Sequence, residues 1–285
     1  MPAVIQNYSF SFAGQVFGGT GSPYQIQSVD GLESLPEIRN QDDNRGYADG
    51  MFSGRDFYGG RTISIIFLTL ASPTASAQAN YNTIQQALQA QQSGTTPLYF
   101  ILSNAAGEQV INARVRGLRT TVDPNYTYGY IVSQVEFFCP DPLYYNSNIQ
   151  TAVLAYTPPT GRVYNRTYNV TYGGGSVIIS TTISNTGWAT TYPTIAISGP
   201  ITNPVVGNTT ENKSLSFVGT YSSADILLVD LYNRVITLNG SPARNTLISG
   251  EWFSALPGNN QFYLTGTGTL AGTTQAVVTW QSAFV

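Results

Sequence analysis

Alternating apolar and polar positions predict that most of this chain forms β-strands. In the clearest run, residues 131–139, Ile131, Val135, Phe137 and Cys139 fall on one face, which is the period of two that a strand requires. Pro140, Asp141 and Pro142 then end the run, because proline lacks the N–H that a sheet needs and disfavours a helical residue before it. A simple sheet edge would explain such a stop. Because the composition also changes here, we interpret Pro140, Asp141 and Pro142 as the break between two domains.

Five further segments before this break carry strand patterns. They are residues 4–12, 24–32, 63–70, 97–102 and 110–118. Residues 63–70 are apolar at consecutive positions, which predicts a strand buried on both faces. The Gly59–Gly60 pair before this strand fits a turn or bulge. A phosphate-binding loop is disfavoured there, because the glycines precede a strand rather than a helix.

The remaining parts of the first half are predicted to be one exposed loop, one turn and one helix. Leu35–Gly50 is dense in charge and is expected to be a loop, and the Asp123–Asn125 segment is expected to be a turn. Residues 76–93 form the helix, because Ala77, Tyr81, Ile84 and Leu88 recur on one helical face. Ser76 or Asn80 can cap its start, and Gly94 can supply a left-handed stop.

The second half is predicted to be a β-sandwich that needs no helix. Short strand patterns alternate there with turn signals every eight to twelve residues or so, which is typical of that architecture. We therefore expect a domain over residues 1–150, a linker over 151–160 and a second domain over 161–285. The predicted fold class is mainly β, with one helix in the first domain.

The amino-acid composition excludes most kinds of catalytic site and metal-binding site. Histidine is absent and Cys139 is the only cysteine, so no histidine-based triad and no intramolecular disulfide can form, and a structural zinc site is not expected. The candidate carboxylates for glycoside cleavage are Asp42 with Asp43, Asp225 with Asp230, and Glu251. No two of these carboxylates are expected to keep the fixed separation that glycoside cleavage needs. Asp42 and Asp43 share an exposed loop, and Asp225 and Asp230 would face opposite ways on one strand. We predict no catalytic residue, no metal and no cofactor.

Charge and hydropathy restrict the partners and the cellular location that we expect for the chain. Charged residues make up 9% of the chain, against roughly 25% in ordinary soluble domains, which favours a surface that packs against neighbours. The net charge of −3 does not indicate the basic surface that nucleic-acid binding requires. No signal peptide and no apolar run of membrane-spanning length is visible, so we expect a soluble chain made in the cytoplasm, with no membrane insertion.

Two tryptophans are candidate sugar contacts. Trp188 and Trp252 lie in predicted turns, where an indole ring could stack on a sugar, whereas Trp280 lies in the final predicted strand and is expected in the core. Core packing is the commoner fate of a tryptophan in a small sandwich. A carbohydrate-binding adhesion module is therefore the alternative function that the residues leave open.

The chain resembles the distal tail protein family of long-tailed, siphovirus-type bacteriophages. In the first half the resemblance rests on GRDFYGGRTISIIF, the single helix, PLYF, ARVRGL and FFCPDPLYY, in that order. In the second half it rests on NTGWATTYPTIAISGPITNP, LLVDLYNRVITLNG, WFSALPGNNQFYLTG and VVTWQSAF. Together these segments cover nearly the whole length.

The resemblance implies a structural protein of the virion tail tip. Its N-terminal β-sandwich with one helix would form a homohexameric ring around a central channel, and its C-terminal domain would be a galectin-like β-sandwich. The ring would join the tail tube protein to the tail-tip hub protein, and some members also carry receptor-binding proteins. DNA would pass through the channel without specific binding, and the 7 arginines against 11 acidic residues over 1–150 suit such a lumen.

Overall fold

The computed structural model describes residues 7–72, 74–90, 94–103, 107–156, 180–267 and 274–285. The chain divides into two compact units. The first unit is residues 1–148 together with Phe284 and Val285, and the second unit is residues 149–283. The division therefore comes after residue 148 rather than at Pro140–Pro142. Those residues end one strand, and the chain then adds another strand to the first unit before it leaves.

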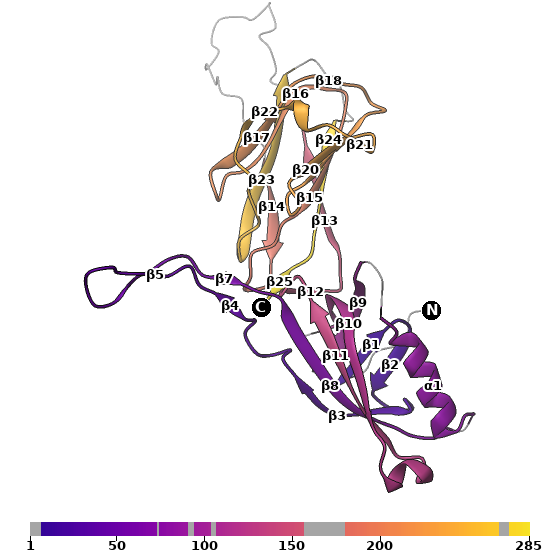
Figure 1. Cartoon of the computed structure of the whole chain (residues 1–285). Helices are drawn as coiled ribbons and strands as arrows, with labels where there is room; N and C mark the ends of the chain where they lie inside the picture. The colour runs from indigo at the N-terminus through magenta and orange to yellow at the C-terminus, as the bar shows by residue number, and fades with distance from the viewer. Residues whose placement is uncertain (1–6, 73, 91–93, 104–106, 157–179, 268–273) are drawn as a thin grey trace, which may run out of the picture. The chain divides into compact units, whose positions relative to one another are not determined.

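The first unit is built on a nine-stranded sheet (Figure 1). The strands in spatial order are β11 (Ile131–Cys139), β8 (Arg61–Thr69), β3 (Tyr24–Asp30), β2 (Gln15–Gly18), β1 (Ser9–Phe12), β9 (Thr96–Ile101), β10 (Gln109–Thr121), β12 (Tyr144–Asn146) and β25 (Ala283–Phe284). Strand β10 pairs with β9 and β12 along its first part and with β11 along its second part. This long strand thus joins the two faces of the sandwich at their edge.

Aromatic residues fill the core of the first unit. Phe10, Phe12, Phe17, Phe67, Phe100 and Phe137 are all buried there. The predicted apolar face of β11 is confirmed, since its buried residues alternate with half-buried ones. Strand β8 shows the same alternation, so the prediction that it is buried on both faces is wrong. On its second face Ser64, Ile66 and Leu68 are half-buried and Thr62 is exposed.

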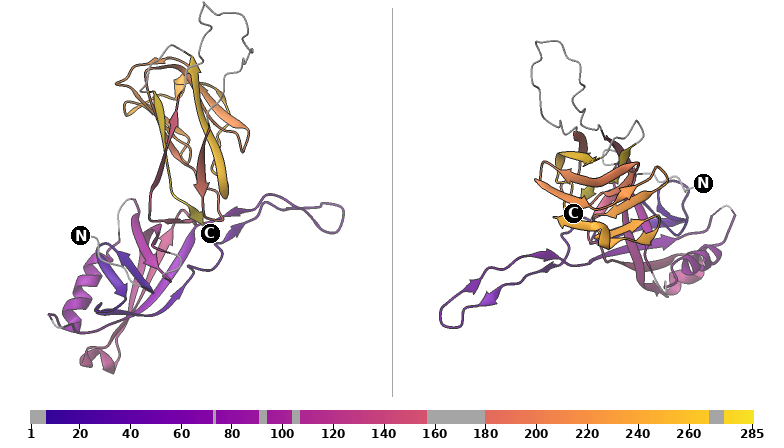
Figure 2. Two further views of the ribbon diagram at one scale, coloured as in Figure 1. Left: turned by 180° about the vertical axis from the view of Figure 1, so that it is seen from behind. Right: turned by 90° about the horizontal axis from the view of Figure 1, so that it is seen from above.

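The α-helix of the described residues, α1 (Ala77–Ala87), lies against this sheet (Figure 2). The Ser76 side chain accepts a hydrogen bond from the Ala79 N–H at 3.2 Å, which confirms the predicted cap. Ala77, Ile84 and Leu88 are buried, as the helical period predicted. The helix ends at Ala87, six residues before the predicted end, and residues 91–93 lie outside the described part.

The segment expected to be a loop is part of a long β-hairpin, which we call the arm (residues 35–60). It contains two short ladders, β4 (Ile38–Arg39) with β7 (Phe57–Tyr58) and β5 (Asp43–Asn44) with β6 (Met51–Phe52). Figures 1 and 2 show the arm projecting away from the sheet of the first unit. At its base a Cβ on Gly60 would lie 2.7 Å from the Phe138 ring. The glycine there provides space for a close approach, and not the turn or bulge that was predicted.

The last residues of the chain complete the first unit. Phe284 stacks on Tyr144, with ring centroids 5.6 Å apart and planes at 10°. Tyr144 in turn meets Phe100 edge-on at 5.6 Å. The aromatic core of the first unit thus includes a residue from the far end of the sequence.

The second unit is an all-antiparallel β-sandwich. One sheet has the order β13 (Gln150–Ala155), β24 (Gln275–Trp280), β15 (Thr194–Ser198), β19 (Ile226–Asp230), β20 (Val235–Leu238), β21 (Ser241–Pro242). The other has the order β14 (Ser180–Asn185), β23 (Gly258–Thr267), β16 (Ile201–Asn208), β17 (Lys213–Phe217), β22 (Leu247–Gly250), and β18 (Thr220–Tyr221) pairs with β16. One 3-10 turn, η2 (Arg244–Thr246), is the helical element found in the described part of this unit.

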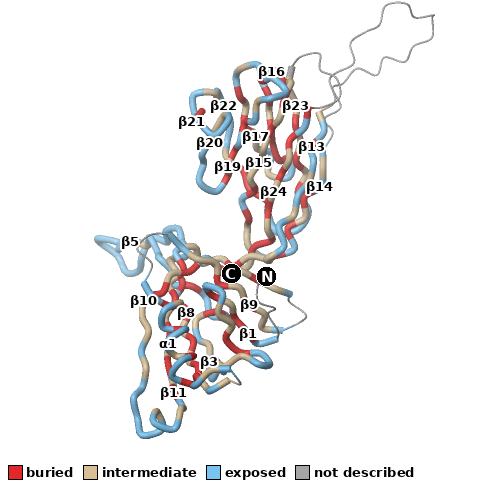
Figure 3. Tube along the Cα trace, turned by 90° about the vertical axis from the view of Figure 1, so that its right-hand side faces the viewer, coloured by how far each residue is buried: buried red, intermediate tan, exposed pale blue. Residues whose placement is uncertain are grey.

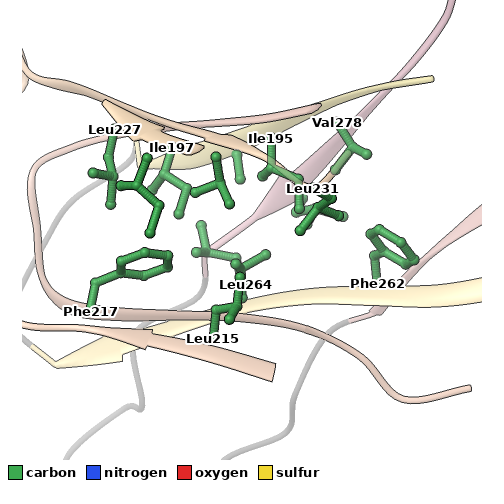
Figure 4. Packing of buried hydrophobic residues seen from close by; sticks show 14 of the residues in the cluster. Ile195, Ile197, Leu215, Phe217, Leu227, Leu231, Phe262, Leu264 and Val278 are labelled. Atoms are coloured by element: carbon green, nitrogen blue, oxygen red, sulfur yellow. The ribbon is translucent and has the colours of Figure 1, made fainter. Parts of the chain in front are cut away.

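Side chains from the two sheets interdigitate to form the core of the second unit. Figure 4 shows Ile195, Ile197, Leu227 and Val278 of one sheet facing Leu215, Phe217, Phe262 and Leu264 of the other. The predicted linker over 151–160 differs from this arrangement, because residues 151–155 belong to β13 and pair with β24. Leu154 from this strand is buried in the core, which is why the segment is ordered as a strand. Residues 157–160 lie outside the described part.

Candidate functional site: the assembly surfaces

The arm exposes large apolar side chains along its length. Those with more than two fifths of their surface exposed are Leu35, Ile38, Tyr47, Met51, Phe52, Phe57 and Tyr58, and Figure 3 shows the arm in the colour of exposed residues. Arg45 lies 5.1 Å from the centre of the Phe52 ring and Arg55 lies 5.9 Å from that of Phe57. A two-stranded ribbon is at best marginally stable in water. The arm is therefore an interaction element that a partner surface would cover.

A buried arginine fixes the base of the arm. Arg61 is 2% exposed, and its guanidinium donates to four backbone carbonyl oxygens: Pro142 (3.0 Å), Gly31 (3.1 Å), Ser34 (2.9 Å) and Leu32. Within the described residues no carboxylate pairs with it. Burial lowers the pKa of Arg61, but a guanidinium remains protonated in proteins. Arg61 thus binds the start of the arm to the Pro140–Pro142 segment, which gives that segment a structural role.

A second projection lies at the opposite end of the β8–β11 pair. Arg61 pairs with Cys139 at the arm end of these strands, and Thr69 pairs with Ile131 at the other end. There β10 and β11 are joined by residues 122–130, which we call the tip. The tip contains the 3-10 helix η1 (Pro124–Tyr128), and Val122, Tyr128 and Tyr130 are 78%, 79% and 54% exposed. Like the arm, the tip exposes large apolar side chains.

Hydrogen bonds hold the tip in one position. The Asp123 side chain accepts from the Tyr126 N–H at 3.2 Å, and Gly129 closes the turn in the left-handed region at φ 83°. The Tyr126 hydroxyl donates to Gln78 of α1 at 2.8 Å. The predicted turn at Asp123–Asn125 is therefore the start of a pre-organised surface, and pre-organisation lowers the entropy cost of binding.

One end of the second unit is held by buried asparagines. Asn185 is 1% exposed and forms four hydrogen bonds: its Nδ2 donates to Ala189 O (2.7 Å) and Ala255 O (3.2 Å), and its Oδ1 accepts from Gly187 N (3.1 Å) and Ala283 N (3.3 Å). Asn208 of β16 and Asn260 of β23 are fully buried, and they hydrogen-bond to each other and to the loop residues Ser254 and Leu256. These loops are rigid because amide groups satisfy their backbone.

The two predicted sugar-contact residues are in different environments. Trp188 is 62% exposed on the loop that Asn185 holds. Trp252 is half-buried against the core, and the Arg244 guanidinium lies 5.1 Å from the centre of its ring. Sugar contact by either residue remains a prediction. Trp280 is 7% exposed and donates from Nε1 to Ser184 O at 3.0 Å, which confirms the predicted core position.

Three of the five candidate catalytic carboxylates accept hydrogen bonds within turns or the arm, while Asp43 lies in β5 and Glu251 is exposed. Asp42 accepts from Gly54 N at 2.8 Å, Asp225 accepts from Ser222 and Asn239, and Asp230 accepts from Tyr232 N at 2.9 Å. Cys139 is fully buried, and burial raises its pKa to about 12, so the thiol is not a nucleophile at neutral pH. Within the described ranges no group of histidine, cysteine, aspartate and glutamate side chains could hold a metal ion, and no helix is long and apolar enough to cross a bilayer.

Glu211 binds two loops of the second unit together. Its carboxylate accepts from Lys213 Nζ at 2.7 Å, from Ser254 N at 2.8 Å and from Ser254 Oγ. Burial alone would raise the pKa of Glu211, but the hydrogen bonds from Lys213 and Ser254 outweigh burial and lower it. The ionised form of Glu211 is therefore favoured by folding.

We expect this carboxylate to make the second unit sensitive to acid. Because the pKa of Glu211 is lower in the folded state, its contribution is complete above the unfolded pKa, near 4.5, and is lost as the pH falls through the folded pKa. Urea unfolding followed by tryptophan fluorescence at pH 7 and pH 3 would measure this loss. The Glu211→Gln variant should lose less stability between these two pH values than the wild type, and an equal loss would contradict the assignment.

Comparison with known proteins gives a family for most of the second unit and a similar fold for the whole chain. Residues 186–284 match the family described as the siphovirus-type tail component, C-terminal domain. These residues belong to a bacteriophage tail component. The crystal structure of the SPP1 Dit protein (gp 19.1), titled a paradigm of the hub adsorption apparatus in phages that infect Gram-positive bacteria, matches with a TM-score of 0.68 at 18% identity, over 98% of this chain and all of that one.

The phage P2 baseplate in its activated conformation with calcium also matches, with a TM-score of 0.48 at 13% identity, over 97% of this chain and 98% of that one. No curated protein sequence matches the chain. The predicted resemblance to a siphovirus-type tail component is confirmed by the family match over residues 186–284, and the chain as a whole shares the fold of SPP1 Dit.

Proposed function

We propose that six copies of this chain form a closed ring that joins the tail tube to the tail-tip hub. The arm is the observation that carries this proposal, because it exposes seven large apolar side chains on a ribbon too thin to stand alone. An arm that lies on the next copy makes a head-to-tail contact, and such a contact closes into a ring when the rotation between copies is sixfold.

The ring would surround a channel through which DNA leaves the virion. The sequence of residues 1–150 has an excess of acidic residues, 11 against 7 arginines, and an acidic wall would repel the DNA backbone and let it pass. The partners in this proposal are the tail tube protein on one side and the hub protein on the other. Receptor-binding proteins are further candidate partners, and the ring would be assembled in the host cytoplasm before it takes its place at the tail tip.

The solution mass tests the ring directly. Six copies of 30.7 kDa give about 184 kDa, and negative-stain images of the same sample would show a central hole. The Met51→Asp, Phe52→Asp variant should reduce the mass to that of one copy, because two buried charges without partners would oppose the arm contact. A wild-type chain that stays at 30.7 kDa would contradict self-assembly.

Ile248→Asp is the matched control for the arm variant. Ile248 is 62% exposed in the second unit and Phe52 is 61% exposed on the arm, so Ile248→Asp and the single change Phe52→Asp each place one aspartate at an equally exposed apolar position. The control should keep the ring mass. If the arm variant also keeps it, the ring is held together by other surfaces.

A further inference from the structure

A hollow in the first unit lies beside α1. Its volume is about 500 Å³, and its wall includes the backbone of Gly18–Gly21, with Ser72, Asn80 and Thr83. Sites that take organic ligands are roughly 300–1,000 Å³, so an aromatic side chain fits the available space. All the residues that line the hollow are uncharged. They offer amide, hydroxyl and peptide groups to whatever enters.

Hydrogen bonds fix the wall of this hollow. The Tyr24 hydroxyl donates to Asn80 O at 2.9 Å, and Asn80 Nδ2 donates to Leu70 O at 2.8 Å. Ser22 Oγ accepts from Tyr24 N at 3.1 Å and itself donates to Val16 O. The hollow is thus held open by β2, β3 and α1 together, and it is as pre-organised as the tip.

The tip and the hollow lie on opposite flanks of α1. Two residues of α1 hydrogen-bond to the β10–β11 hairpin that ends in the tip. The Tyr126 hydroxyl donates to Gln78, and the Tyr81 hydroxyl lies 2.9 Å from the Thr120 hydroxyl. Asn80 and Thr83 line the hollow. At 3.6 residues per turn these two pairs fall on either side of the buried face that contains Ala77 and Ile84. One unit therefore presents a projection and a recess in different directions.

We propose that the tip of one copy inserts into the hollow of the next copy, with Tyr128 as the inserted side chain. A head-to-tail contact needs two different patches that complement each other, and this unit supplies a projection with exposed tyrosines and a recess lined by uncharged, mostly polar residues, each fixed by hydrogen bonds. The Tyr128 ring is 79% exposed, and tyrosine is among the residues that contribute most to interface affinity. The proposal rests on the proposed ring and assigns a second contact to it, separate from the arm.

Cross-linking between two introduced cysteines tests this contact. In the Thr83→Cys, Tyr128→Cys variant, mild oxidation should join neighbouring copies into a ladder of covalent species that extends to six. Cys139 does not interfere, because it is fully buried with its pKa raised to about 12. Tyr128→Cys alone should give at most a dimer, because one cysteine at the surface cannot form a chain of links.

Each other outcome overturns the proposal in a different way. A ring of about 184 kDa, six times 30.7 kDa, without the ladder would show that the hollow takes something else while the ring itself stands. A single copy that migrates faster would show that the two cysteines meet within one chain. If the wild type is a monomer, the ring and this contact fail together.

A charge at the same position gives a second test that needs no cross-link. Tyr128→Arg should lower the solution mass, because an unpaired guanidinium would enter an uncharged recess. The far-UV circular dichroism spectrum of the variant should match that of the wild type, since the Tyr128 side chain is exposed in the single copy and its change leaves the fold intact. A ring of unchanged mass in this variant would overturn the proposal.

Discussion

Replacing Arg61 with methionine is expected to destabilise the first unit by roughly 3–5 kcal/mol. Methionine fills a similar volume, but it leaves the carbonyl oxygens of Gly31, Leu32, Ser34 and Pro142 without their donor. A buried carbonyl without a partner costs about 1–3 kcal/mol. We therefore expect this change to be among the most damaging in the chain, although Arg61 touches no other charged group in the described residues.

The positions of the tryptophans allow this loss to be assigned to one unit. All three, Trp188, Trp252 and Trp280, belong to the sequence of the second unit. In Arg61→Met the far-UV circular dichroism should show early unfolding of part of the strand signal, while the fluorescence transition stays where it is in the wild type. A fluorescence transition that moves equally would show that the two units unfold together.

Two further arginine variants sharpen the Arg61 test. Arg55→Met changes an exposed arginine on the arm and should alter the stability by less than about 0.5 kcal/mol. Arg61→Lys keeps the charge but loses the planar fork, so it should recover only part of the loss. If Arg61→Lys is as stable as the wild type, the positive charge rather than the geometry of the donors is what matters.

Asn185→Ala is expected to destabilise the second unit by roughly 3 kcal/mol or more. The change removes four hydrogen bonds at once and leaves Ala189 O and Ala255 O, as well as Gly187 N and Ala283 N, without their side-chain partner. Because the site is 1% exposed, water cannot replace the amide without opening the loop. The tryptophan fluorescence transition in urea should move to a clearly lower midpoint.

Asn185→Asp separates the donor and acceptor roles of this amide. Aspartate keeps an oxygen for Gly187 N and Ala283 N but cannot donate to the two carbonyl oxygens, and it buries a charge at neutral pH. This variant should therefore also be destabilised. Asn233→Ala, at an exposed turn position with one side-chain bond to Asp230, is the control and should cost less than about 1 kcal/mol.

Local periodicity was sufficient to predict the regular elements. The buried face of β11 and the cap at Ser76 were both readable, because a period of two, a period of 3.6 and a capping hydroxyl are signals within a few neighbouring residues. The arm was not predicted, because its ladders are two residues long and too short to show a period. The exposure of Phe52 depends on the absence of a covering layer, which no local pattern encodes.

The structural roles of the buried polar residues could not be predicted from the sequence, for a different reason. Arg61 is buried because carbonyl oxygens from residues 31–34 and from Pro142 converge on it, and the two segments are about a hundred residues apart in the chain. Asn185 looks like any asparagine in a turn until Ala255 and Ala283 are brought beside it. Such residues are recognised from tertiary geometry, and their sequence context resembles that of ordinary surface positions.

The stacking of Phe284 on Tyr144 has a consequence for the order of events during synthesis. A ribosome releases the amino-terminal part of a chain first, and domains generally fold in that order. Here the first unit lacks one aromatic residue of its sheet until the whole of the second unit has been translated. The nascent first unit is therefore unfinished during that interval, and an assembly that needs its completed form would begin only after the second unit has been translated.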